Sequence, residues 1–326
     1  MSLRVVVCAV ALLYPALGTT APELPFDTTN QGLLIQLHGL PAIGTARPLA
    51  PAELRAGLSY EAANHFLAKS RATESLHLDG ETHRTTLKLV RGFSAGREIG
   101  IEIPYVDHGG GFLDSFIENW HDFFGLPQNG RDRMPHDQLL FNYRRDGVDR
   151  IRLTQPTAGV GDVRLTAGQL LGNGTDTMLR FSLKLPTGDD AELLGSGTTD
   201  IALWFSTRCR SEACPGAWSW YGGGGLLWMD RGKVLPDLQR RLVGFGSAGL
   251  HWRALERVTL GVQLDTHTPF YDDSELKPLS GASVQLVMGG WWRMHPRHAL
   301  EIAVIEDVAV DTAPDVVIRI GLHSWF

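Results

Sequence analysis

The sequence predicts an all-β protein: a transmembrane antiparallel up-and-down β-barrel of about 12 strands. Three observations lead to this prediction. Segments of about ten residues recur in which apolar and polar side chains alternate, as in a strand with one face of each kind. The polar positions carry full charges and glycine, as the wall of a wet or tightly filled lumen does. After the first twenty-odd residues, no stretch reaches the roughly 18 apolar residues that a spanning helix requires.

The alternation is clearest at 177–185, where Leu179 and Phe181 take one face while Arg180 and Ser182 take the other. Twelve such segments place both ends of the barrel on the periplasmic side, because the number is even. A hairpin near 138–154 would raise the count to fourteen without changing that parity. The expected strands are 54–66, 76–91, 97–106, 160–171, 177–186, 198–207, 217–228, 242–253, 257–267, 281–293, 298–306 and 316–326.

The lengths of the connections agree with this topology, with the exception of 208–216, a periplasmic connection of moderate length that carries Cys209 and Cys214. Four of them are short, as periplasmic turns are, and four are longer, as outer loops are. The short ones are 92–96, 172–176, 254–256 and 294–297, and the long ones are 187–197, 229–241, 268–280 and 307–315. Aromatic residues gather near strand ends, where a membrane–water interface would favour them: Trp218, Trp220, Tyr221, Trp228, Trp252, Trp291, Trp292 and Trp325.

The first 53 residues precede the barrel, which we assign to 54–326. Residues 1–21 have a positive charge, an apolar stretch and a run of small residues, and so predict a cleaved signal peptide. Residues 22–53 contain the apolar stretch Gly32–Leu40, and we expect them to plug the barrel or to cover its periplasmic mouth. Export leaves two cysteines, Cys209 and Cys214, which predict a disulfide that closes a small loop.

A net charge of −6 argues against a nucleic-acid partner, which would require a basic surface. Motifs typical of enzymes occur without the context that they need. The glycines of 244–249 match a dinucleotide fingerprint, but no βαβ unit follows. The run 108–111 imitates a lipase oxyanion loop, yet a Gly-x-Ser-x-Gly elbow is missing. We therefore predict no catalytic residues, no cofactor and no metal site.

The loop 107–136 differs from the others because its apolar residues recur at helical spacing. Positions 113, 116, 117, 120, 123 and 124 share one face of an expected short amphipathic helix. That helix could cap the mouth, constrict the lumen or lie on the lipid surface. The polar residues Asp114, Glu118 and His121 are the candidates for a gate in this loop.

Two runs resemble domain-of-unknown-function family 3187, a family of uncharacterised Gram-negative outer-membrane proteins. The first is Gly-Gly-Phe-Leu-Asp at 110–114 with Ile-Glu-Asn-Trp-His-Asp-Phe-Phe-Gly-Leu-Pro at 117–127. The second is Leu-Lys-Leu-Pro-Thr-Gly-Asp at 183–189 with Leu-Gly-Ser-Gly-Thr-Thr-Asp at 194–200. The resemblance implies a barrel in the outer membrane and transfers no catalytic residues.

The expected function is that of a channel or transporter for small solutes, since charges on a pore wall set its selectivity. The alternatives are a closed structural or interaction barrel that acts through its outer loops, and an outer-membrane lipid hydrolase built on His267 and a strand serine. Expected partners are outer-membrane lipid, a small solute and the barrel-insertion machinery, which would recognise the last strand ending at Phe326. The lumen candidates are Arg55, Glu61, Lys88, Glu98, Glu102, Arg164, Arg180, Lys184, Gln263, Asp265, His267, Gln285, Arg293, Glu301, Arg319 and His323.

Overall fold

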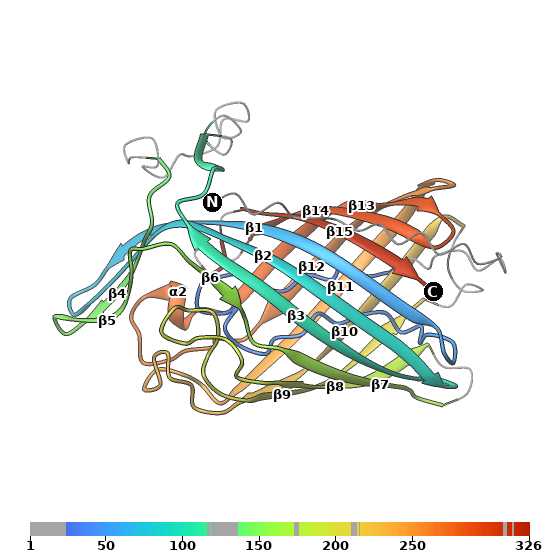
Figure 1. Ribbon diagram of the computed structural model, residues 1–326, viewed down its shortest axis with the longest axis horizontal. Coiled ribbons are helices and arrows are strands. Elements are labelled where there is room, and N and C mark those ends of the chain that lie inside the picture. The colour runs from blue at the N-terminus through green and yellow to red at the C-terminus, as the bar shows by residue number, and fades with distance from the viewer. Residues whose placement is uncertain are drawn as a thin grey trace.

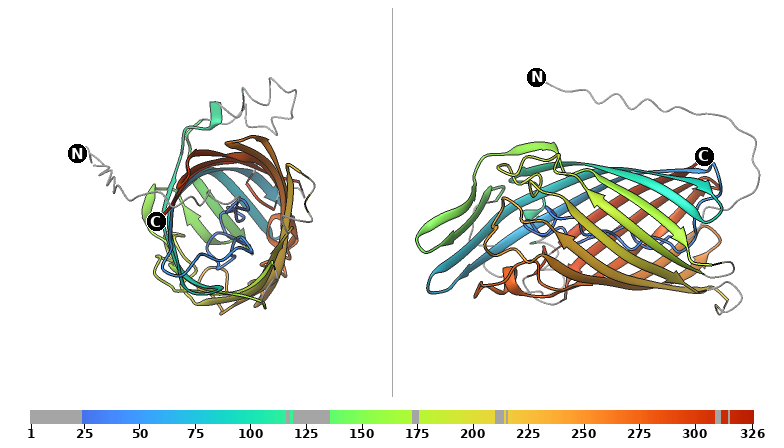
Figure 2. Two further views of the ribbon diagram at one scale, coloured as in Figure 1. Left: turned by 90° about the vertical axis from the view of Figure 1, so that its right-hand side faces the viewer. Right: turned by 90° about the horizontal axis from the view of Figure 1, so that it is seen from below.

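The computed structural model describes residues 24–115, 118, 136–172, 176–209, 214, 216–308, 312–314 and 316–326. Within these residues one β-sheet closes on itself into a barrel (Figures 1 and 2). Its segments are β1 (Leu54–Ser70), β2 (Glu74–Ser94), β3 (Arg97–Gly109), β4 (Leu140–Arg145), β5 (Val148–Leu153), β6 (Thr157–Val160), β7 (Arg164–Leu170), β8 (Thr177–Lys184), β9 (Asp200–Arg208), β10 (Trp218–Met229), β11 (Leu242–Leu255), β12 (Val258–His267), β13 (Ser283–His295), β14 (His298–Asp307) and β15 (Val316–Trp325). A four-residue helix, α2 (Lys277–Ser280), lies between β12 and β13.

The barrel has twelve strands, as the sequence predicts. β1 closes it by pairing antiparallel with β15, from Arg55 opposite Trp325 to Asn64 opposite Val316. β6 and β7 both pair with β3 and together make one interrupted wall strand. The hairpin β4–β5 pairs with β2 at Glu74–Asp79, and β3 takes the same edge of β2 from Glu81 onward. The hairpin therefore extends the sheet beyond the barrel, and the alternative of fourteen wall strands is wrong.

Side chains alternate across the wall as the sequence pattern requires. On β8 the apolar residues Leu179 and Phe181 are exposed on the outer surface, while Arg180 and Lys184 are buried inside. On β15, Ile320 and Leu322 face outward and Arg319 and His323 face inward. Successive side chains of a strand point to opposite faces, so the polar positions of the alternating wall strands lie on the interior.

The two ends of the barrel differ. One end is here called the turn end. Short connections join β2 to β3, β11 to β12 and β13 to β14 there, and the backbones of Leu54 and Phe326 form hydrogen bonds with each other. At the other, the loop end, residues 185–199, 230–241 and 268–282 make longer connections. β1 and β2 are longer than predicted and run past the wall with β4 and β5 as a projecting sheet (Figure 1).

Residues 24–49, here called the inner segment, run through the barrel interior (Figure 2, left). Their apolar side chains contribute to two buried clusters. One contains Leu33, Leu37 and Ile43 with residues of the wall and of the loop end, and the other joins Phe26 to Trp291 of β13. Among the described residues, no helix has the length and apolar character needed to cross a membrane. The helix expected in 107–136 falls mainly on residues outside those described.

Candidate functional site

The candidate site is the barrel interior, where the alternating pattern of the wall places most of the predicted lumen residues. Two of them, Lys88 and Glu102, are half-buried and ion-paired, and Arg55 and Arg293 are half-buried near the turn end. The others are buried on the inner face: Glu61, Glu98, Arg164, Arg180, Lys184, Gln263, Asp265, His267, Gln285, Glu301, Arg319 and His323.

One set of interior charges spans the seam at which the barrel closes. Arg319 of β15 lies between two carboxylates, with Nη1 at 3.0 Å from Glu61 Oε1 of β1 and Nε at 3.2 Å from Glu301 Oε1 of β14. His323 Nε2 lies 3.1 Å from the second oxygen of Glu301. Opposite charges at this depth neutralise one another, and these pairs tie three neighbouring strands together.

A second set of charges links the wall to the inner segment. Lys88 Nζ lies 2.8 Å from Asp27 Oδ1 and 2.8 Å from Glu102 Oε1. Arg164 Nη1 reaches the other oxygen of Glu102 at 2.9 Å. Asp27 is therefore the member of this network that the wall does not supply.

Lys184 of β8 is the centre of a third set, near the loop end. Its ammonium lies 2.5 Å from Asp162 Oδ2 and 3.2 Å from Asp200 Oδ2, and it donates to the carbonyl of Leu37 at 3.1 Å. Asp200 also accepts the backbone N–H of Gly39 at 2.8 Å. The inner segment thus supplies both a donor and an acceptor to a buried network of wall charges.

Further wall groups donate to the backbone of the inner segment. Arg180 pairs with Glu98 at 2.9 Å and also donates to the carbonyls of Ile43 and Thr45. The indole N–H of Trp204 donates to the carbonyl of Ile43 at 2.9 Å. Irregular backbone inside a barrel needs partners for its polar groups, and the wall side chains provide them.

Polar contacts continue along β12. Thr28 donates through its hydroxyl to Asp265 Oδ2 at 2.6 Å, and Gln263 donates to the carbonyl of Phe26 at 3.3 Å. Asn30 lies against His267, with 2.8 Å between its amide nitrogen and Nε2. Nδ1 of the same ring lies 2.9 Å from the carbonyl of Thr268. His267 is therefore buried inside the barrel, where its two ring nitrogens lie against Asn30 and the carbonyl of Thr268.

Loop residues hold the inner segment at the loop end. Tyr271 is buried, and its hydroxyl donates to the carbonyl of Leu34 at 3.1 Å. Burial, together with the nearby charge of Asp200, raises the pKa of the Tyr271 phenol above its ordinary value, so the hydroxyl keeps its proton and remains a donor. Phe270 packs beside His38 with ring centroids 5.4 Å apart.

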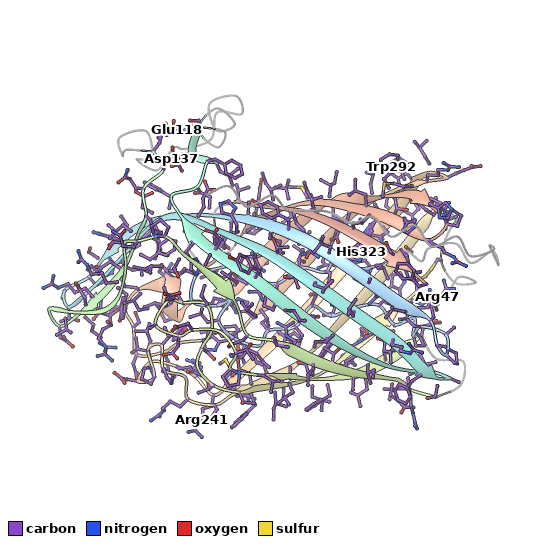
Figure 3. All side chains as sticks on the ribbon, in the orientation of Figure 1. Arg47, Glu118, Asp137, Arg241, Trp292 and His323 are labelled. Atoms are coloured by element: carbon purple, nitrogen blue, oxygen red, sulfur yellow. A yellow bond between two sulfur atoms is a disulfide. The ribbon has the colours of Figure 1, made fainter. Side chains whose placement is uncertain are left out.

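At the turn end the interior opens into a cavity of about 560 Å³, here called the turn-end cavity. It is lined by Tyr221, His251 and Trp291 among others and by the arginines Arg47, Arg208, Arg253, Arg257 and Arg293. Figure 3 shows Arg47 at this end of the barrel. The cavity contrasts with a smaller one of about 40 Å³, which remains between Asp27 and the wall charges around Lys88.

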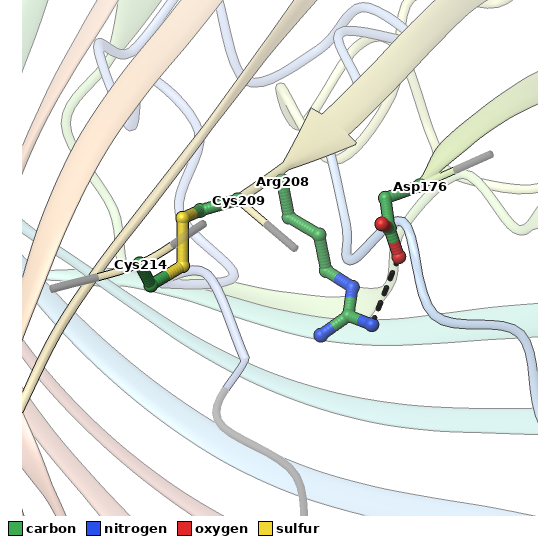
Figure 4. The surroundings of a disulfide bond; sticks show 4 residues. All are labelled: Asp176, Arg208, Cys209 and Cys214. Atoms are coloured by element: carbon green, nitrogen blue, oxygen red, sulfur yellow. Dashed lines mark hydrogen bonds and ion pairs between the residues drawn. A yellow bond between two sulfur atoms is a disulfide. The ribbon is translucent and has the colours of Figure 1, made fainter. Parts of the chain in front are cut away.

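The predicted cysteine pair lies beside the turn-end cavity. Cys209 and Cys214 are joined by a disulfide, and both residues line the cavity (Figure 4). Arg208, adjacent in sequence, forms an ion pair with Asp176, with Nη2 at 3.0 Å from Oδ1. The disulfide therefore borders one of the cavity arginines.

Of the gate candidates, Asp114 is buried and Glu118 lies outside the barrel; His121 lies outside the described residues. Asp114 accepts the N–H of Asp137 at 3.0 Å and the side-chain amide of Asn64 at 3.2 Å. Glu118 Oε1 lies 2.9 Å from His136 Nε2. Figure 3 shows Glu118 and Asp137 together outside the barrel, near its loop end, so these two residues do not line the lumen.

Sequence reasoning missed three acidic residues of the interior: Asp27, Asp162 and Asp200. Asp27 lies outside the expected strands, Asp162 lies within the expected strand 160–171 but between the observed β6 and β7, and Asp200 begins β9. These three carboxylates lie next to lysine side chains only in the folded chain, and the sequence holds no local pattern that marks them. A further buried carboxylate, Glu81, lies on the face of β2 opposite to Lys88 and accepts the N–H of Leu113 at 2.6 Å.

The aromatic prediction needs a partial correction. Trp218, Trp220, Trp228, Trp252 and Trp292 are exposed on the outer surface. Tyr221, Trp291 and Trp325 are buried, because they occupy the inward phase of their strands. Among the residues that the structure describes, no group of three or more His, Cys, Asp or Glu side chains is placed to hold a metal ion.

Comparison with solved structures shows the same fold in an outer-membrane channel. The COG4313 outer membrane channel from Pseudomonas putida F1 superposes with a TM-score of 0.57 at 12% identity, covering 86% of this chain and 98% of that one. The NanC porin gives a TM-score of 0.46 at 10% identity, with 83% and 98% covered. A search of curated proteins finds no match. The family model described as "Protein of unknown function (DUF3187)" matches residues 1–326, and the chain therefore belongs to that family.

Proposed function

We propose that the protein is an outer-membrane channel for small solutes and that the inner segment controls passage through it. The observation that carries the proposal is that polar groups of the wall form hydrogen bonds and ion pairs with the inner segment. Lys184, Arg180 and Asp200 on the wall each bond to the backbone of the inner segment, and Lys88 pairs with Asp27. The wall charges also pair with one another, and these further bonds make the inner segment an integral part of the polar interior.

The outer surface supports a membrane location. Trp218 and Trp228 lie near opposite ends of β10 and are both exposed on its outward face. Ten residues of strand span about 33 Å, and a tilt of about 40° reduces this to roughly 25 Å along the barrel axis. That height matches the apolar band of an outer-membrane barrel, so the two rings would sit at its two interfaces.

The orientation follows from the connections. Short turns and the ends of the barrel chain face the periplasm in barrels of this type, which assigns the turn end to the periplasm and the loop end to the outside. Export through a cleaved signal peptide and insertion through the strand that ends at Phe326 complete the proposed route to the membrane.

The inner segment leaves little free space in the middle of the barrel. The cavity beside Asp27 has a volume of about 40 Å³. That volume holds about one water molecule and is too small for a solute. Passage therefore requires the inner segment to shift, which would break contacts such as the Gly39–Asp200 hydrogen bond.

A disulfide tether tests this requirement. A Cβ built on Gly39 lies 2.9 Å from the Asp200 Cβ, so the pair Gly39→Cys and Asp200→Cys could be bridged after a shift of less than about 1 Å. We expect the oxidised double variant to remain closed in planar bilayers at voltages where the wild type conducts. Reductant should restore conductance to the level of the two single variants, which cannot form the tether.

The wild type under the same reductant controls for opening of Cys209–Cys214. Conductance of the oxidised double variant equal to that of the wild type would disprove control by the inner segment.

The second candidate function is a closed structural barrel, which the apolar packing of Leu33, Leu37 and Ile43 inside the barrel favours. A wild type that never conducts, oxidised or reduced, would select that alternative.

A further inference from the structure

We infer that the turn-end cavity is a binding site for small organic carboxylates, with the anionic group at its arginines and a planar apolar body on its aromatic floor. The cavity measures about 560 Å³, which lies in the range of small-molecule sites. Its lining separates into a charged rim and an aromatic floor, and each part favours one half of such a ligand.

The rim is strongly basic. Five arginines line the cavity, and Glu256 is the one carboxylate among its described lining residues. Arg208 is paired with Asp176, and Arg293 donates to the backbone carbonyl of Glu256. Within the described part of the chain, Arg47 and Arg257 form no ion pair. Guanidinium groups bind planar carboxylates in a bidentate manner, so this excess of cations favours an anion of that shape.

Two buried donors in the lining support the same ligand. The indole Nε1 of Trp291 and the Nε of Arg208 are buried and, among the residues described, have no hydrogen-bond partner. Trp291 is only 6% exposed. A buried donor without a partner costs roughly 1–3 kcal/mol, so a ligand oxygen that reached either group would be stabilised by a hydrogen bond. A carboxylate supplies such an oxygen.

The floor is formed by rings that point into the barrel. Tyr221 and His251 pack with centroids 4.8 Å apart, and Trp291 stacks on Phe26 of the inner segment at 6.4 Å. Aromatic faces and edges favour a planar apolar group against them. An acetate ion would use the rim alone, whereas benzoate would use both parts, so benzoate is the probe that we choose.

The inference deepens the proposed function, because a site at the periplasmic mouth would give the channel a preferred class of solute. Its role in transport rests on that proposed function, but binding itself does not. Calorimetric titration of the full-length exported chain in detergent with benzoate measures binding without any need for conductance. Benzamide, which has the ring without the charge, and acetate, which has the charge without the ring, complete the set.

We expect saturable binding of benzoate, with benzamide and acetate each at least tenfold weaker. The double variant Arg47→Gln and Arg257→Gln should weaken benzoate binding at least tenfold. The matched control Arg241→Gln removes an exposed arginine beyond the cavity, at the loop end (Figure 3), and should bind like the wild type. Added salt should weaken binding, because it screens the exposed rim.

Absence of saturable benzoate binding would overturn the inference, as would equal binding by the double variant or by benzamide. Equal weakening in Arg241→Gln would also overturn it, because general loss of positive charge would then explain the effect. Benzoate binding without conductance in planar bilayers would support the binding site and contradict the proposed channel. Conductance without benzoate binding would support the channel and contradict the binding site.

Discussion

At the scale of single residues, the packing of the interior depends on glycines over which a large side chain lies in close contact. Tyr221 of β10 lies directly opposite Gly249 of β11 and crosses it to reach Gln263 of β12, where its hydroxyl donates to Oε1 at 2.7 Å. A Cβ on Gly249 would lie 2.2 Å from the Tyr221 ring. The glycine is therefore required by the tyrosine that lies across it.

Replacement of Gly249 by alanine should destabilise the barrel by about 1–3 kcal/mol, because the added methyl group must displace a packed ring. The measurement is the free energy of unfolding in denaturant, with the protein in detergent micelles. Gly244→Ala on the same strand is the matched control, because its Cβ would meet its nearest neighbour at 3.6 Å, an ordinary contact. Equal stability of the two variants would show that Tyr221 is not fixed by this contact.

At the scale of elements, the seam between β1 and β15 decides whether the sheet closes. Backbone pairing joins the two strands over ten residue pairs, and Arg319 adds contacts to β1 and β14 on either side. The alternation of the last strand predicts that Arg319 faces inward. Only closure determines that its neighbours there are Glu61 and Glu301.

Arg319→Met should therefore be strongly destabilising, by about 3–5 kcal/mol, because two buried carboxylates would lose their shared counter-charge. We expect the folded band seen in unheated gel samples to convert to the unfolded one at a lower temperature. Arg319→Lys should retain part of the stability, and Arg97→Met, at an exposed arginine that contacts Gln169, should have little effect. An unchanged conversion temperature for Arg319→Met would contradict a structural role for the seam charges.

At the scale of the whole molecule, the outer surface of the barrel is apolar and its interior polar, the reverse of a water-soluble sandwich. Exposed leucine, isoleucine and phenylalanine side chains occupy the outward positions of β8, β9, β12 and β15. The inner segment supplies apolar side chains to the interior, where the wall supplies mostly polar ones. The same phase of alternation thus gives an apolar surface on the outside and a polar wall that contacts the inner segment on the inside.

Brominated lipids should quench the outward tryptophans of the protein in vesicles. Trp218→Phe and Trp228→Phe should each reduce the quenchable fraction, because both rings are exposed on the outer surface. Bromine placed near the headgroups should quench them more than bromine at the bilayer centre, as for rings at the two interfaces. Trp325→Phe, at a buried ring, is the control; a larger effect there than at Trp218 would contradict the assigned inner and outer faces.

The class of the fold, the twelve wall strands and the inward or outward phase of the clearly alternating strands follow from the sequence alone. A period of two is a local property, so Arg180, Lys184 and Arg319 were assigned to the interior without knowledge of their neighbours. The aromatic residues Tyr221 and Trp291 were assigned wrongly when their clustering near strand ends was weighed above their phase.

What fills the barrel and which charges lie together could be learned only from the folded chain. Residues 24–49 lack a strand pattern, and their apolar stretch fitted a plug and a cover equally well. The contacts of Asp27, Gly39 and Leu37 with wall residues that follow about 60 to 160 positions later arise from closure of the whole sheet. Such pairings depend on the three-dimensional path of the chain, because residues so far apart share no local periodicity that could mark them.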